Sequence, residues 1–265
     1  MNTDDRREQI LTLVNKTADS VKTSELATLL NVTTETIRKD LIYLDNRNLV
    51  KKFHGGAMPV AEFVEQSLGL RLSENVLSKK AIAQKALEQL AGSSVIYIDA
   101  GSTTCELAKL LSQVTVSHTN MQRAIVTNSF TVANELMGSI HTRFFLGGDI
   151  SDVTQSTGGL WAINALGSIN IDLAFVGSSG FLSHHGPGTK ISSDALLKSE
   201  VIKKANRTII LADYSKFTSN AIMQFAEWSQ IDLLITDSNV QEQHLKEVSN
   251  YVNVIVADAL EGEDD

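Results

Sequence analysis

From Val95 onward, short apolar runs alternate with segments that suit helices, and this alternation constrains the fold more than any other feature. The runs have strand length and span residues 95–98, 124–127, 143–146, 173–176, 208–211 and 233–235. Such alternation is typical of a mostly parallel sheet whose faces are covered by helices. We therefore predict an α/β domain over residues 93–260.

Small polar residues or glycines follow most of these runs. They are residues 99–104, 127–129, 147–148, 177–180, 213–216 and 236–237. A parallel sheet gathers the carboxyl ends of its strands along one edge, and open α/β folds bind ligands at that edge. We expect a ligand site there.

The turn from Asp99 through Gly101 into Ser102, Thr103 and Thr104 has the composition of an anion site. It joins a strand to a helix predicted over residues 104–111. Free backbone N–H groups, the three hydroxyls and the positive end of the helix dipole suit a phosphate group. A glycine turn with a Ser or Thr cap also begins many helices that bind nothing.

The first part of the chain predicts three helices. The first spans residues 5–16, and the second spans residues 25–30, with Thr23 or Ser24 as its cap. After the turn at residues 31–33, the third spans residues 34–46 with Thr33 as its cap. Apolar residues Ile37, Leu41 and Leu44 recur along the third helix at the spacing of one face, which we expect to point into a core.

The opposite face of the third helix has the composition of a DNA-reading surface. It carries Thr34, Arg38, Lys39 and Tyr43. Short polar and long basic side chains on a face free of the core suit the major groove, and we add Thr33 and Thr36 to this set. Arg38 is the candidate for a bidentate guanine contact.

Residues 49–57 form a strand-like stretch that ends in a glycine pair, which indicates the wing of a winged helix-turn-helix. We expect Lys39, Lys51 and Lys52 to contact phosphates, with His54 beside them. The alternative is a solvated basic face in which Glu35 and Lys39 form a surface ion pair. We assign residues 1–58 to the DNA-binding domain and residues 59–92, with a polar helix around 78–90, to a linker and lead-in helix.

The distribution of charge agrees with a DNA-binding first domain. The net charge is −8. Residues 1–60 hold 9 Lys and Arg against 8 Asp and Glu, whereas residues 61–265 hold 14 against 23. A local basic strip on an acidic protein directs DNA to one face.

Two runs, VTTETIRKDL at residues 32–41 and LVKKFHGGA at residues 49–57, closely resemble the DNA-binding signature of DeoR-type regulators. The second half resembles that family's sensor domain. The matching positions there are Asp99–Thr104, Thr127–Ser129, Gly147–Gly148, Asp172 with Phe175 and Gly177, Lys198, and Asp213 with Lys216. The sequence departs from the family pattern at Asn48, Ser102, Leu196 and Ser199.

The resemblance implies a sensor related in fold to ribose-5-phosphate isomerases. It also implies a phosphorylated sugar as effector, and repression of a carbohydrate-metabolism operon that the effector relieves. It adds Asn128, Gly148, Asp172, Lys198 and Lys216 to the predicted effector residues. The two lysines would supply charge to a phosphate or hydrogen bonds to sugar hydroxyls; the alternative is that either is a surface lysine.

The competing hypothesis is an isomerase-like enzyme with a DNA-binding arm. Isomerases that resemble this fold carry the segment Asp-Gly-Ala-Asp-Glu after the strand that here contains Asp172, because moving a proton between carbons needs a positioned carboxylate. This chain has Val176-Gly-Ser-Ser-Gly180 there. We therefore favour binding over catalysis.

The remaining expectations concern partners and location. Operators are commonly read as repeated half-sites by symmetric oligomers, so we expect double-stranded operator DNA and a dimer or tetramer. We expect no cofactor and no metal, because adjacent His184 and His185 would point to opposite faces of a strand and Cys105 is the only cysteine. We see neither a membrane-spanning run nor a signal pattern and expect a cytoplasmic protein.

Overall fold

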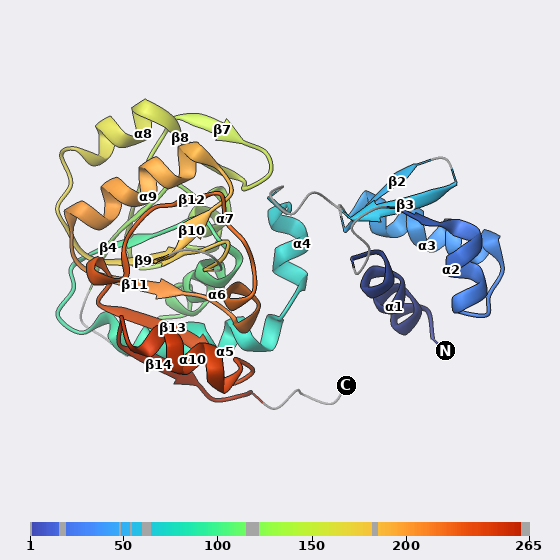
Figure 1. The fold of residues 1–265 in the computed structure, drawn as a ribbon. Coiled ribbons are helices and arrows are strands. Elements are labelled where there is room, and N and C mark those ends of the chain that lie inside the picture. Colours follow the sequence, from blue (N-terminus) through green and yellow to red (C-terminus); the bar gives the residue numbers. More distant parts are fainter. Residues whose placement is uncertain are drawn as a thin grey trace. The chain divides into compact units, whose positions relative to one another are not determined.

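The computed structural model describes residues 2–15, 20–47, 49–53, 55–59, 65–114, 122–181 and 185–260. The chain divides into two compact units, Met1–Leu70 and Arg71–Asp265 (Figure 1). Among the described residues, no helix has the length and apolar character needed to cross a membrane.

The first unit is a helix-turn-helix with a small antiparallel sheet. Its elements are α1 (Thr3–Asn15), β1 (Val21–Lys22), α2 (Thr23–Leu29), α3 (Thr34–Asn46), β2 (Val50–Phe53) and β3 (Gly56–Pro59), with strand order β1-β3-β2. Ile37, Leu41 and Leu44 of α3 are buried against Ile10 of α1 and Leu26 of α2, as their spacing predicts. The predicted helices and wing are therefore confirmed.

The predicted cap of the second helix is wrong. Lys22 is the N-cap, in extended conformation, and Thr23 is already the first helical residue. Pairing with β3 keeps the chain extended up to Lys22, and the Thr23 N–H donates to the Gly55 carbonyl at 2.8 Å. The helix therefore begins directly at the end of β1, and Lys22 occupies the cap position.

The glycine pair of the wing is required by the backbone. Gly55 has φ of +102°, which L residues with side chains rarely adopt. A Cβ on Gly56 would lie 2.3 Å from the Val21 carbonyl oxygen, because β1 passes directly against β3. Gly55 is therefore needed for the turn of the hairpin, and Gly56 is needed for the close approach of β1 to β3.

The second unit is built on a parallel sheet that, in the described residues, has seven strands in the order β14-β13-β11-β9-β4-β5-β6. Every neighbouring pair is parallel. The strands are β4 (Val95–Ile98), β5 (Ala124–Thr127), β6 (Thr142–Phe145), β9 (Ile171–Gly177), β11 (Ala205–Leu211), β13 (Leu233–Asp237) and β14 (Val254–Ala257). The α/β prediction is confirmed, and β14 is an edge strand that it lacked.

Helices cover both faces of the sheet. One core joins it to α5 (Val76–Leu87), α6 (Ser102–Ser112) and α7 (Phe130–Glu135), and the other joins it to α8 (Gly159–Leu166), α9 (Ser192–Lys204) and α10 (Glu242–Ser249). Along β4, Ile96 and Ile98 enter the first core and Tyr97 enters the second. This two-sided burial explains why the central strands β4, β9 and β13 are mostly apolar.

Shorter elements lie between these. They are α4 (Leu68–Ser73), β7 (Asp149–Ser151), β8 (Ser156–Gly158), β10 (Gly188–Thr189), β12 (Met223–Gln224) and the 3₁₀ turns Glu88–Leu90, Tyr214–Phe217 and Trp228–Gln230. The pairs β7–β8 and β10–β12 are antiparallel.

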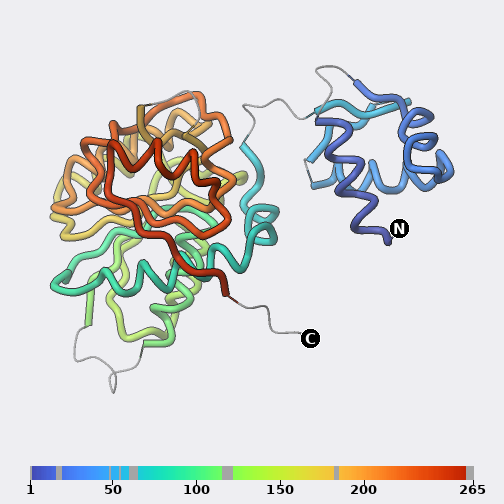
Figure 2. Tube along the Cα trace, turned by 60° about the horizontal axis from the view of Figure 1, so that its bottom comes forward, coloured from blue at the N-terminus to red at the C-terminus, as the bar shows by residue number. Residues whose placement is uncertain are grey.

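The lead-in helix predicted at the end of the linker is present as α5, and it packs as part of the second unit. The second unit already begins at Arg71, and α5 buries Ala81, Ile82 and Ala86 against the sheet. In Figure 2, α5 (blue-green) and β14 (dark red) lie side by side, although they are far apart in the sequence. This helix looks polar in sequence because small alanines supply much of its buried face.

Candidate DNA-reading and effector sites

The start of α3 is fixed by two threonines. Thr33 is the N-cap, and its Oγ1 accepts a hydrogen bond from the Thr36 N–H at 3.2 Å. The Thr33 and Thr36 hydroxyls also contact one another at 2.9 Å. Both predicted DNA-binding residues therefore have a local role in orienting the helix.

Thr34, Arg38 and Lys39 are exposed on α3, as predicted. Arg38 Nη1 lies 3.3 Å from Glu35 Oε2, so the surface pair on this helix is Arg38–Glu35 rather than the alternative Glu35–Lys39 pair. Both side chains are mostly exposed, and ion pairs of this kind contribute roughly 0–1 kcal/mol. Arg38 can therefore leave Glu35 for a DNA base at small cost.

A buried carboxylate ties α3 to α1. Asp40 Oδ2 accepts from Arg6 Nε at 2.6 Å and its Oδ1 from Arg7 Nε at 3.1 Å. The hydrogen bond to Asp40 raises the pKa of Arg6. These bonds hold the reading helix against the rest of the unit.

Tyr43 does not belong to the exposed reading face on which it was predicted. Its ring lies between two guanidinium groups, with Arg7 Cζ 3.5 Å and Arg47 Cζ 4.3 Å from the ring centroid. Stacking of this kind is a cation–π contact. Tyr43 thus supports α3.

The wing presents one exposed and one half-buried lysine. Lys51 is exposed on β2, and the backbone N–H of Lys52 donates to Asp45 Oδ1 at 2.8 Å. That bond fixes β2 to the end of α3, so the two elements that carry the predicted phosphate contacts are held together. His54 lies outside the described residues.

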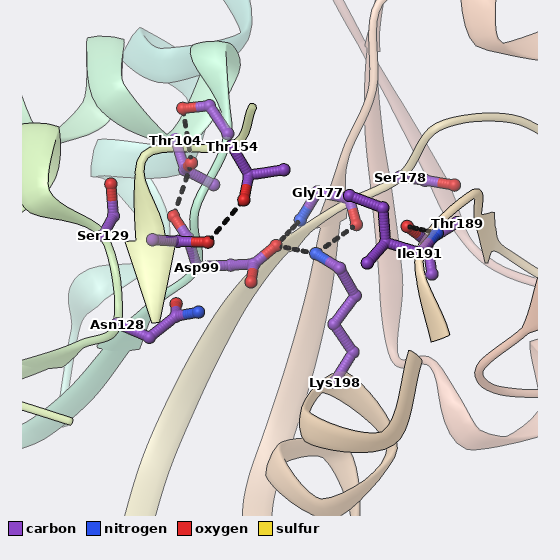
Figure 3. A network of polar contacts seen from close by, with 12 residues as sticks. Asp99, Thr104, Asn128, Ser129, Thr154, Gly177, Ser178, Thr189, Ile191 and Lys198 are labelled. Carbon is purple, nitrogen blue, oxygen red and sulfur yellow. Dashed lines mark hydrogen bonds and ion pairs between the residues drawn. The ribbon is translucent and has the colours of Figure 1, made fainter. Parts of the chain in front are cut away.

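The centre of the sensor site is a buried ion pair. Asp99, which follows β4, pairs through Oδ2 with Lys198 Nζ from α9, and both side chains are almost wholly buried. The same Oδ2 accepts from the Gly177 N–H at 2.9 Å, and Lys198 also donates to the Gly177 carbonyl at 3.3 Å. Figure 3 shows Lys198 reaching from its helix to Asp99 beside Gly177. The pair thus joins the carboxyl ends of β4 and β9 to α9.

Helix α6 begins at Ser102, shortly after Asp99 in the chain. Gly101 is its N-cap without a side-chain cap, and the Thr104 hydroxyl donates to the carbonyls of Asp99 at 2.7 Å and Gly101 at 3.0 Å. Ser102 and Thr103 are buried in the first turn. The first backbone N–H groups of a helix have no partner inside it, and the predicted anion site rests on this feature.

Asn128 lies on the other side of Asp99 from Lys198 (Figure 3). Its Oδ1 accepts from the Tyr97 hydroxyl at 2.9 Å, and its Nδ2 donates to the Thr157 carbonyl at 2.8 Å. Burial raises the pKa of Tyr97 well above its ordinary value, so the hydroxyl stays a donor. Asn128 is therefore positioned by bonds within the protein.

Asp172 is not brought to this site. It lies at the amino end of β9, where its Oδ2 accepts from the backbone N–H groups of Ser94 at 2.8 Å and Val95 at 2.9 Å. Because β4 and β9 are parallel, Asp172 and Asp99 lie at opposite edges of the sheet. The structure places Asp172 away from the Asp99 site, in a position where it holds two strands together.

Gly148 follows β6 and has a packing role. Its φ is +148°, and a Cβ there would lie 2.2 Å from the Gly158 carbonyl oxygen, at the residue before α8. Glycine at this position is explained by the close passage of two chain segments.

Lys216 lies at the same edge of the sheet but belongs to a second cluster. It follows β11, and its backbone N–H donates to the Asp213 carbonyl at 3.0 Å. Burial lowers the pKa of Lys79 to about 8, with Asp213 opposing the decrease and Lys216 adding to it. Because β9 separates β11 from β4, the structure divides the predicted lysines between neighbouring clusters.

Lys79 is a residue that the sequence prediction missed. Its Nζ donates to the carbonyls of Arg71 and Glu74, which ties the α4–α5 connection to α5. In the described part of the chain, the neighbouring Asp213 has a buried oxygen, Oδ2, without a hydrogen-bond partner. The signal was hidden because the sequence prediction treated the helix around residues 78–90 as a polar lead-in helix.

The polar segment that follows β9 carries serines at the site. The Ser178 hydroxyl donates to the Gly188 carbonyl at 2.9 Å, and Thr189 follows Gly188 in the same strand. Figure 3 shows Ser178 and Thr189 on the same side of Asp99 as Lys198. Ser178 and Thr189 were not predicted individually. Their signal was the polar segment after the strand at residues 173–176.

A separate cleft of about 340 Å³ lies beside α6 and α7. Its lining consists of Leu72, Cys105, Lys109, Phe130, Thr131, Asn134, Glu135 and Gln155. It contains none of the predicted effector residues. Across the described ranges, no group of three or more His, Cys, Asp or Glu side chains is arranged to hold a metal.

Two family profiles match the chain. The DeoR-like helix-turn-helix domain matches residues 6–62, and the DeoR C terminal sensor domain matches residues 74–238. The chain is 32% identical to the HTH-type transcriptional regulator GlpR of Haloferax volcanii, over 97% of this chain and 98% of that protein. It is 30% identical to the glycerol-3-phosphate regulon repressor of Escherichia coli, over 88% and 90% of the two chains. Both relatives are transcriptional regulators.

Among solved structures, ribose 5-phosphate isomerase A from Methanocaldococcus jannaschii superposes with a TM-score of 0.39 at 17% identity, over 52% of this chain and 53% of the isomerase.

Proposed function

The chain belongs to the DeoR family of transcriptional regulators, and from that premise we propose that it represses a carbohydrate-metabolism operon and leaves its operator when a phosphorylated sugar binds. The observation that carries this proposal is the pairing of two sites in one chain. One is an exposed polar and basic face on a firmly held helix, and the other is a buried polar site at the carboxyl ends of a parallel sheet.

The DNA contacts are assigned to α3 and the wing. Thr34, Arg38 and Lys39 are exposed on a helix anchored through Asp40, which suits insertion into the major groove. Arg38 would read a guanine, and Lys39 and Lys51, with Lys52, would contact phosphates. Each lost phosphate contact should reduce the slope of log affinity against log salt by about one.

The effector contacts are assigned to the carboxyl edge of the sheet. The phosphate would occupy the first turn of α6, at Ser102, Thr103 and Thr104, where backbone N–H groups and the helix dipole favour an anion. Sugar hydroxyls would exchange hydrogen bonds with Asp99 and Lys198. Lys216, in the neighbouring cluster, would add positive charge.

The buried ion pair offers a physical route to release. A bound anion competes with Asp99 for Lys198, and α9 carries that lysine, so effector binding would favour a different arrangement of α9 and the strand ends. A ligand shifts such an equilibrium only by its difference in affinity for the two arrangements. The segment after Pro59 would pass this preference to the DNA-binding unit.

The test of the DNA half is binding to a fragment from upstream of the chain's own gene, followed by fluorescence anisotropy at two salt concentrations. Arg38→Ala should weaken specific binding by roughly 1–3 kcal/mol, the value of a bidentate base contact. Lys246→Ala, an equally exposed change on α10, is the matched control and should bind as the unmodified chain does. Equal affinity of all three proteins would contradict the assignment of α3.

A further inference from the structure

Helix α8 presents an exposed face without charge. Ala162 and Leu166 are buried against the sheet, whereas Leu160, Trp161, Asn164 and Ala165 are exposed. Trp161 is 79% exposed. The sequence from residue 153 through residue 171 contains no Asp, Glu, Lys or Arg. A surface helix normally carries charged or polar residues on its solvent side, so this face is unusual for one that meets only water.

Exposed apolar residues continue beyond the helix. Ile150 lies on β7, in the hairpin that leads into α8, and is largely exposed. Figure 1 shows the hairpin and the helix at the same end of the second unit, in agreement with their contacts. Phe144 is half-exposed on edge strand β6 and is paired in register with Val126 of β5. Paired residues of neighbouring strands point to the same face of a sheet, and Val126 lies in the core that also contains Ala162 of α8. Phe144 therefore lies on the face of the sheet that α8 covers. We call Phe144, Ile150, Leu160 and Trp161 the α8 surface.

We propose that the α8 surface is the interface through which two copies of this chain associate. Charge identifies the occupant, because two chains of net charge −8 repel over most of their surfaces. A twofold contact centred on α8 brings the same residues of both copies together. The helix itself carries no charged side chain, so no like charges meet at the centre, while the exposed Asp149 and Asp152 of the hairpin lie beside it. DNA or an acidic membrane would require the lysines and arginines that the helix lacks.

The composition suits an interface of ordinary size. Burial of a Trp removes roughly 150–250 Å² from water, about a quarter of the ~800 Å² per partner that a stable interface needs. Tryptophan is enriched among the residues that dominate such contacts. Trp161, flanked by Leu160 and Ile150, would therefore be the central contact.

Light scattering after size exclusion, without DNA, tests the proposal. The unmodified chain should associate, and Trp161→Glu should be monomeric at the same concentration, because it places two carboxylates across the twofold axis. Tyr251→Glu makes the same change at an exposed aromatic beside α10 and should remain associated. A monomeric unmodified chain, or loss of association in both variants or in neither, would overturn the proposal.

Tryptophan fluorescence gives a second readout on the unmodified chain. The two tryptophans are Trp161 and Trp228, and only 6% of Trp228 is exposed. Acrylamide should quench little emission in the associated chain and more on dilution, as Trp161 becomes accessible. Strong quenching at concentrations where the chain is associated would place Trp161 outside the interface and overturn the proposal. Failure of DNA binding would leave both readouts unaffected.

Discussion

Replacing Lys198 with methionine should destabilise the sensor unit strongly. The substitution keeps most of the side-chain volume but removes the cation that pairs with Asp99. Asp99 is 2% exposed, so water cannot replace the lost partner, and the Gly177 N–H at 2.9 Å is the bond that remains at Oδ2. Leaving one charge of a buried pair without its partner costs about 3–5 kcal/mol.

The double variant Asp99→Asn with Lys198→Met sharpens this prediction. Each single change leaves an uncompensated buried charge, whereas the double change leaves none. We therefore expect the double variant to lose less stability than the two single variants lose together. The difference, which is the interaction free energy of the pair, should be roughly 1–3 kcal/mol.

Urea unfolding followed by tryptophan fluorescence measures these free energies. Both tryptophans lie in the second unit, so the signal reports that unit. Lys203→Met is the matched control, because Lys203 lies on the same helix and forms an exposed pair with Glu200 at 2.7 Å. It should cost less than about 1 kcal/mol. A loss for Lys198→Met no larger than this, or additive losses in the double variant, would refute the reasoning.

Three further changes test other parts of the structure. Asp40→Asn removes the charge that receives Arg6 and Arg7 and should destabilise the first unit by about 1.5–3 kcal/mol in thermal unfolding followed by circular dichroism; an unchanged midpoint would contradict this. Burial lowers the pKa of Lys79 from 10.5 to about 8. Between about pH 8 and pH 10.5 the unfolded chain therefore binds more protons than the folded chain. The free energy of unfolding should rise with pH over this range, by at most about 3 kcal/mol. Comparison with Lys79→Met in urea at about pH 8 and 10 isolates that rise, and an equal pH dependence of both proteins would count against it. Burial raises the pKa of Cys105 to about 11, so iodoacetamide should alkylate it slowly at about pH 8 in the native chain and rapidly in urea; equal rates would show that the thiol is not protected.

Periodicity predicted most of the elements because burial selects residue types at fixed spacing. The α3 residues Ile37, Leu41 and Leu44 form one buried stripe, and the apolar run at residues 95–98 is buried on both faces of the sheet. In both cases the local pattern records the environment directly. The helix around residues 78–90 was predicted as well, but its burial as α5 was not, since part of its buried face is alanine.

The site was predicted less completely because its geometry is not local. Asp99 and Lys198 pair across much of the sequence, and the resemblance rather than spacing identified Lys198. Asp172 precedes an apolar run, and strand direction alone puts it at the amino end of that strand, at the opposite edge of the sheet from Asp99.

The most direct test of the account is a titration of the protein–operator complex with phosphorylated sugars and their unphosphorylated forms, followed by fluorescence anisotropy. The account predicts that one phosphorylated sugar weakens operator binding by at least about tenfold, or 1.4 kcal/mol, while its unphosphorylated form does not. Specific operator binding that no phosphorylated sugar changes, or turnover of one of these sugars by the protein, would contradict it.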